Sequence, residues 1–169
     1  MDEWGPRTYG EPCRECGFSW NAPVPDAVAS VAAFPAALAD ELAYTSGAER
    51  GAGLSWSVTA YVAHVSDNLR IWAERIAGIT MGGSSAVTSY DENLLAAARG
   101  YDALSSQGAT WGLKRSVRDW IEAVAGAPAD LRMTHPERGV LELDQIVRSN
   151  AHDAMHHLWD IRRILAAQP

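Results

Sequence analysis

The chain has 169 residues, of which 47% are apolar and 21% charged, and its formal net charge is -7. This length suits a single domain that buries its core without disulfide support. The acidic balance, with Lys114 as the only lysine, argues against nucleic acid and anionic membranes as partners. The first residues show no signal-peptide pattern and no apolar stretch approaches the roughly 18 residues of a membrane span, so we expect a cytoplasmic protein.

The chain divides by composition into an N-terminal arm and one domain. Glycine and proline are frequent in residues 1–24, which predicts an irregular arm, and residues 25–169 form the expected domain. Apolar residues at three- and four-residue spacing then predict a first helix from Asp26 to about Tyr44. Pro35 lies within this helix and is expected to kink or split it.

The same spacing predicts further helices along the rest of the chain. They run from Ser55 or Ser57 to Ile79, from Asp91 to Ala98, from Ser105 or Ser106 to Ala125 with Trp111 facing inward, and from 141–144 to Ala167. Residues 126–139 are expected to be a linker. No segment as long as the predicted helices alternates apolar and polar residues with the period of two that a strand would show. The prediction is an all-α four-helix bundle with an irregular N-terminal arm and a short extra helix.

Histidines on two of the predicted helices form a candidate metal site. His152 and His156 are four residues apart on the last helix, so their Cβ atoms lie roughly 6 Å from each other on one face. His64, next to the apolar stripe of the second helix, can point into the bundle from its flank. Three neutral imidazoles with an open fourth position are the usual ligands of catalytic zinc, and nickel or iron bind similar sets. The alternative interpretation is that these are ordinary core or surface histidines.

Two aspartates are candidates for orienting these imidazoles. Asp67 follows His64 by one helical turn, and Asp160 follows His156 by one turn. Either carboxylate could accept the second N–H of a ligand imidazole, and a salt bridge on the helix surface is the competing interpretation.

The cysteines form a second candidate site. Cys13-x-x-Cys16 followed by Gly17 has the spacing of half a zinc knuckle, in which glycine allows the tight turn. His135 or a histidine of the bundle could supply the remaining ligands. Two other interpretations stay open: a pair of reduced cysteines in a mobile arm, and an arm that brings a thiolate near the histidine site.

Two segments taken together resemble a known family. Residues 56–72, which contain His64, and residues 150–161, with the sequence His-Asp-x-x-His-His-x-x-Asp after Asn150-Ala151, are similar to the DinB-like superfamily. This superfamily includes YfiT-type metalloenzymes and the mycothiol- and bacillithiol-dependent transferases and isomerases. The segment Cys13–Phe18 is similar to an actinobacterial branch.

The resemblance implies a fold and a ligand set. The implied fold is an up-down-down-up bundle, commonly a homodimer, with a divalent metal held by three histidines. His64, His152 and His156 match the ligand positions, and His157 is the alternative because adjacent histidines leave the register uncertain by one residue.

The resemblance also implies an activity. It favours a metal-dependent transferase, isomerase or hydrolase that activates a low-molecular-weight thiol such as mycothiol, or water, against a small electrophilic metabolite. A metal with neutral ligands keeps its positive charge and so lowers the pKa of a bound thiol or water. The competing hypothesis is a non-catalytic helical dimer that binds a metal or a small hydrophobic molecule.

Overall fold

Helices with one apolar stripe make up most of the chain in the computed structural model, which describes residues 5–43 and 45–168. The long helices are α2 (Val24–Leu42), α3 (Val58–Thr80), α5 (Ser106–Gly126) and α6 (Leu143–Ala166). The predicted four-helix bundle is therefore confirmed. α2 is continuous through Pro35, so the expected split does not occur, and the predicted end at Tyr44 lies outside the described residues.

Side-chain caps fix where several of these helices begin. The hydroxyls of Ser57 and Ser105 accept hydrogen bonds from backbone N–H groups in the first turns of α3 and α5. Asp91 does the same for the short helix α4 (Glu92–Arg99), which the sequence predicts from Asp91 to Ala98. Glu142 and Gln145 form a reciprocal capping box at the start of α6. The caps place the ends of the helices within a few residues of the expected positions.

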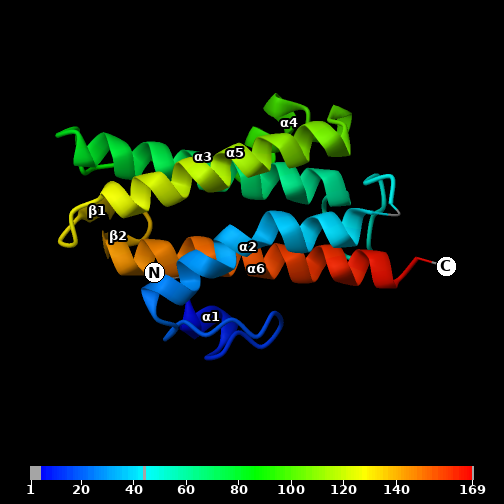
Figure 1. The fold of residues 1–169 in the computed structure, drawn as a ribbon, viewed down its shortest axis with the longest axis horizontal. Helices are drawn as coiled ribbons and strands as arrows, with labels where there is room; N and C mark the ends of the chain where they lie inside the picture. Colours follow the sequence, from blue (N-terminus) through cyan, green and yellow to red (C-terminus); the bar gives the residue numbers. More distant parts are fainter. Residues whose placement is uncertain (1–4, 44, 169) are drawn as a thin grey trace.

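The bundle has an up-down-down-up order. Figure 1 shows by its colours that α3 and α5 run in the same direction, while α2 and α6 run the opposite way. α3 packs mainly against α5, and α2 packs mainly against α6. Because α3 and α5 are parallel neighbours, the chain between them must return along the bundle, and it carries α4 and the 3-10 turn Tyr101–Ala103. Across the described ranges, no helix has both the length and the apolar character that crossing a bilayer requires.

Two segments contain regular structure that the sequence did not predict. The arm includes a one-turn helix, α1 (Pro6–Tyr9), and the expected linker contains the antiparallel strands β1 (Arg132–His135) and β2 (Gly139–Glu142). Only two β1 residues are buried, so the period-two pattern is too short to recognise. The hairpin matters for the site because Thr134 forms a parallel bridge with Ala86 and its carbonyl accepts a hydrogen bond from the N–H of Val87, which supports the chain that leads to Tyr90.

Trp111 also departs from its predicted position. The side chain was expected to face the core, but it is 63% exposed on α5. The guanidinium of Arg115, one turn further along the helix, lies 5.0 Å from the centre of the indole ring. This cation–π contact stabilises the exposed indole ring, so the apolar character of Trp111 is a poor guide to its burial.

A chain of buried amides links three helices to the segment before α4. The indole N–H of Trp120 donates to Asn150 at 2.9 Å, and the Asn150 amide donates to Asn68 at 3.2 Å. The Asn68 amide in turn donates to the Tyr90 hydroxyl at 3.4 Å. Asn150 is 2% exposed, so its two hydrogen bonds replace lost contacts with water. The chain fixes α3, α5 and α6 relative to the segment that carries Tyr90.

We predict that Asn150→Ala lowers the free energy of unfolding by about 2–4 kcal/mol, because it leaves the Trp120 donor and the Asn68 acceptor buried without partners. Urea titration followed by circular dichroism measures the change. The matched control is Asn93→Ala on the exposed face of α4, which should change the free energy by less than about 0.5 kcal/mol. Equal effects of the two substitutions would show that the amide chain does not hold the helices together.

Candidate metal centre

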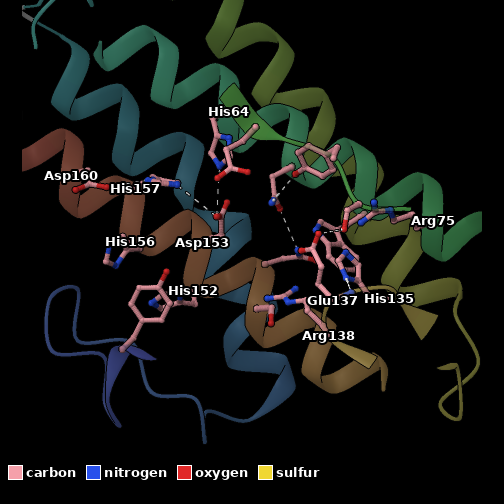
Figure 2. A pocket seen from close by; sticks show the side chains of 18 of the residues that line it. His64, Arg75, His135, Glu137, Arg138, His152, Asp153, His156, His157 and Asp160 are labelled. Carbon is pink, nitrogen blue, oxygen red and sulfur yellow. Dashed lines mark hydrogen bonds and ion pairs between the residues drawn. The ribbon is translucent and has the colours of Figure 1, made fainter. Parts of the chain in front are cut away.

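α6 carries two pairs of candidate ligands that are offset by one residue. His152 and His156 form one i, i+4 pair, and Asp153 and His157 form the next. A one-residue step rotates a side chain by about 100° around an α-helix, so the two pairs face different neighbours. Figure 2 shows Asp153 and His157 directed toward His64 of α3, whereas His152 and His156 lie on the side of the N-terminal arm.

The first group consists of His64, Asp153 and His157, with one possible ligand atom from each within 4.8 Å of the others. The Nε2 atoms of His64 and His157 lie 3.7 Å and 3.6 Å from Oδ1 of Asp153. His64 and Asp153 are 6% and 5% exposed. The sequence predicts His64, His152 and His156 as one ligand set, whereas the structure brings His64 together with the register alternative His157 and with Asp153.

The buried charges of this group support one another. Burial opposes protonation of His157, but the carboxylates of Asp153 and Asp160 outweigh it and raise the pKa of His157. Burial would raise the pKa of Asp153, yet His157 and His64 lower it to about 2. Asp153 is therefore ionised at neutral pH, and its Oδ2 atom is buried with no hydrogen-bond partner among the residues that the structure describes. Such an atom is suited to binding a cation.

The two aspartates considered for orienting imidazoles have different partners. Oδ2 of Asp160 lies 3.0 Å from Nδ1 of His157, so it can fix the ring with Nε2 directed at Asp153. Asp67 instead accepts a hydrogen bond from the Tyr101 hydroxyl at 2.7 Å and pairs with Arg99 at 2.9 Å. The carboxylate of Asp67 thus faces the 3-10 turn and not a histidine, a contact that the spacing between Asp67 and His64 does not predict.

The second group combines the arm with the other face of α6. One ligand atom each of Cys13, Cys16, His152 and His156 lies within 4.8 Å of the others. Burial lowers the pKa of His152 to about 4 and also lowers the pKa of His156, so both rings are neutral at pH 7. His135, which the sequence analysis considered as a partner of the cysteines, stacks on Trp72 with ring centres 6.2 Å apart.

Both histidine faces border one cavity of about 430 Å³. His64, Asp153 and His157 line it at one end. Arg75, His135 and Arg138 line it elsewhere, together with Tyr90 from the chain that the hairpin supports. Tyr9 of the arm also contributes to the wall. The first group therefore has protein on one side and an open space large enough for a small molecule on the other.

The comparisons with known proteins agree with this architecture. Residues 32–161 match the family model described as the DinB superfamily. This chain belongs to the DinB superfamily, which confirms the resemblance drawn from residues 56–72 and 150–161.

One solved structure illustrates the likeness at the level of the fold. YfiT from Bacillus subtilis is 15% identical, with a TM-score of 0.72, and the similarity covers 83% of this chain and 85% of that one. YfiT is described as a probable metal-dependent hydrolase with an unusual four-helix bundle topology. No curated protein sequence matches the chain significantly.

The donor atoms present fit a divalent metal. Two imidazoles and one carboxylate are the protein ligands of several catalytic zinc sites and of non-haem iron sites. Tetrahedral zinc with such ligands needs donor atoms roughly 3.4 Å apart, close to the separations between Asp153 and the two histidines. Sequence reasoning missed Asp153 as a ligand because the neighbouring pair of His152 and His156 satisfies the same spacing rule. Its i, i+4 spacing to His157 is the signal that was present.

We predict that Asp160→Ala weakens zinc binding at His64, Asp153 and His157 by roughly tenfold to a hundredfold, because the His157 ring loses the acceptor of its Nδ1–H. Nitrogen NMR of the histidine rings can follow zinc titration at each residue separately. Asp119→Ala, at a half-exposed position of α5 whose carboxylate pairs with Arg118, is the control and should leave the titration unchanged. The role of Asp160 would be refuted if both variants bound zinc like the unaltered protein.

Proposed function

We propose that this protein is a metal-dependent enzyme in which His64, Asp153 and His157 hold a divalent cation at the wall of the cavity. Zinc suits this donor set, and nickel and iron are the alternatives. The observation that carries the proposal is the convergence of these donors, from α3 and α6, on one side of a cavity of about 430 Å³. On the cavity side there is room for a further ligand to the cation. A catalytic metal needs such an open coordination position, whereas a structural metal has all its positions filled by protein ligands.

A cation bound there would lower the pKa of a coordinated thiol or water and so provide a nucleophile at neutral pH. The protein residues prepare the site for this chemistry. Asp160 orients the His157 ring, and the buried carboxylate of Asp153 supplies the negative charge that attracts the cation. The Trp56 indole packs against His64 with ring centres 4.8 Å apart, which restricts that ring and covers it from solvent.

The cavity also contains a site suited to an anionic part of the substrate. The Arg75 guanidinium lies 4.7 Å from the centre of the Trp72 ring and 5.7 Å from that of Tyr90. Its Nη2 atom donates to the carbonyl of Thr88, whereas Nη1 is buried and finds no hydrogen-bond partner in the described part of the chain. Because an unpaired buried donor is costly, we infer that Nη1 binds a carboxylate or similar group of the substrate.

The reaction we propose is transfer of a low-molecular-weight thiol, such as mycothiol, to a small electrophile. The resemblance of residues 56–72 and 150–161 to thiol-dependent members of the superfamily supports this choice. Hydrolysis, with water in place of the thiol, is the second candidate, and the description of YfiT as a probable metal-dependent hydrolase favours it. Both reactions need the same metal ligands and differ in the nucleophile.

We expect removal of the metal to abolish activity and added zinc to restore it. Mycothiol consumption with chlorodinitrobenzene and hydrolysis of nitrophenyl acetate are to be measured on the same apo and zinc-loaded preparations. His64→Ala and Asp153→Ala should reduce the metal-dependent rate by at least about a hundredfold, whereas Asp119→Ala should not. Metal-dependent hydrolysis without thiol transfer would select the second candidate. The proposal would be contradicted if neither removal of the metal nor the two ligand substitutions changed the rates.

For anionic substrates, we predict that Arg75→Met raises KM about tenfold or more and that Arg75→Lys retains part of the affinity. A neutral analogue of the same electrophile, such as its methyl ester, should show no such change. Arg118→Met, on the exposed face of α5, serves as the control for loss of one positive charge. If Arg75→Met affected charged and neutral substrates alike, Arg75 would be a packing residue and not a specificity residue.

A further inference from the structure

The N-terminal arm meets α6 at the face that the proposed catalytic site does not use. Cys13 and Cys16 approach His152 and His156 there, and one possible ligand atom from each lies within 4.8 Å of the others. Cys13 is 2% exposed and His152 is 1% exposed. Both cysteines are free thiols. Four soft or borderline donors therefore gather inside the protein, on residues far apart in sequence.

His152 gives the strongest indication that this group binds a ligand. Its Nδ1 and Nε2 atoms are both buried, and neither has a hydrogen-bond partner within residues 5–43 and 45–168. The ring is enclosed by Trp20 and Tyr9, whose centres lie 4.3 Å and 4.6 Å away. A buried polar atom without a partner is rare in folded proteins because its lost hydration is not replaced. A metal ion would bind one of the two nitrogens.

The backbone of the arm has the geometry of a zinc knuckle. Gly17, directly after Cys16, has a φ angle of 75°, a conformation that side chains disfavour. The N–H of Gly17 donates to the carbonyl of Cys13 at 3.0 Å, which closes the turn between the two thiols. The N–H of Cys13 donates to the carbonyl of Phe18 at 2.8 Å. The turn thus directs both sulfur atoms toward one point.

His156 completes the arrangement with a nitrogen on each side of its ring. Nδ1 lies 3.8 Å from Sγ of Cys13, close to the roughly 3.6 Å that separates sulfur and nitrogen ligands of tetrahedral zinc. Nε2 lies 3.3 Å from a carboxylate oxygen of Glu15. Histidines that bind zinc commonly donate their second N–H to a carboxylate in this way.

We propose that Cys13, Cys16, His152 and His156 bind a second zinc ion in a closed tetrahedral site that fastens the N-terminal arm to α6. With four protein ligands the site leaves no position for a substrate, so its role is structural. It goes beyond the proposed function, because the catalytic metal uses His64, Asp153 and His157. The arm carries Tyr9, which lines the cavity, so the structural zinc also maintains one wall of the proposed active site.

Zinc stoichiometry of the full chain, free of affinity tags, separates the two sites. We expect about two zinc ions per chain in the unaltered protein and about one in Cys13→Ser/Cys16→Ser and in His64→Ala/Asp153→Ala. Replacing zinc with cobalt should give a thiolate-to-metal charge-transfer band in the unaltered protein and in His64→Ala/Asp153→Ala. The band should be absent from Cys13→Ser/Cys16→Ser.

The outcomes keep this inference distinct from the proposed function. A cobalt spectrum of the unaltered protein without the thiolate band would overturn the second site and leave the catalytic proposal intact. Binding of about one zinc ion together with the band would instead place that ion at the cysteines and contradict the catalytic metal. Loss of the band in His64→Ala/Asp153→Ala would also overturn it, because the two sites would then not be separate. Full activity of His64→Ala/Asp153→Ala would refute the proposed function and not the structural zinc.

A milder variant tests the site without removing a ligand. Glu15→Gln should weaken zinc binding at the cysteine group by roughly tenfold to a hundredfold, because His156 loses its charged acceptor. Asp40→Asn, at an exposed position of α2, removes one negative charge away from His156 and is the control. Cobalt titration monitored at the charge-transfer band gives both affinities. Equal affinities in the two variants would contradict the proposed role of His156 as a ligand.

Discussion

The arrangement of α6 depends on the 100° rotation that each residue makes around an α-helix. Two i, i+4 pairs separated by one residue cannot share a face, so His152 and His156 turn toward the arm while Asp153 and His157 turn toward α3. The up-down-down-up order of the bundle places His64 opposite the second pair. One face of α6 therefore meets α3 and the other meets the arm, and both faces border the cavity.

The two groups of donors differ in their chemistry as well as in their direction. Asp153 is ionised and His157 has a raised pKa, because carboxylates and imidazoles are paired in a buried setting. On the other face, burial lowers the pKa of His152 and His156 and raises the pKa of Cys16 to about 11. A metal at the cysteines must therefore displace a thiol proton, as zinc does on binding. One face has a carboxylate and an open side, and the other has thiols and a closed set of donors.

Much of the fold could be predicted from the sequence, because long amphipathic stripes and capping residues such as Ser57 and Asp91 indicate helices directly. The hairpin could not, since a strand as short as β1 gives too few residues for a period-two pattern. Trp111 was misplaced because its apolar ring is satisfied by Arg115 at the surface. Pro35 suggested a break, yet the tertiary packing of α2 accommodates it.

The candidate site was predictable in its residues but not in its grouping. Sequence spacing identifies His64, the histidines of α6 and the two cysteines as unusual. It does not show which face of α6 meets α3, because the pairs 152/156 and 153/157 satisfy the same spacing rule. Asp153 was overlooked for the same reason, and His135 was considered for a site from which the stacking on Trp72 separates it. Only the three-dimensional arrangement of α3, α6 and the arm distinguishes these alternatives.

The most direct test of the two-face arrangement is anomalous diffraction from crystals of the zinc-loaded protein, measured on either side of the zinc absorption edge. We expect two anomalous peaks, one among His64, Asp153 and His157 and one among Cys13, Cys16, His152 and His156. A single peak bound by His64, His152 and His156 together would contradict the account, because those residues would then have to meet from different faces of α6.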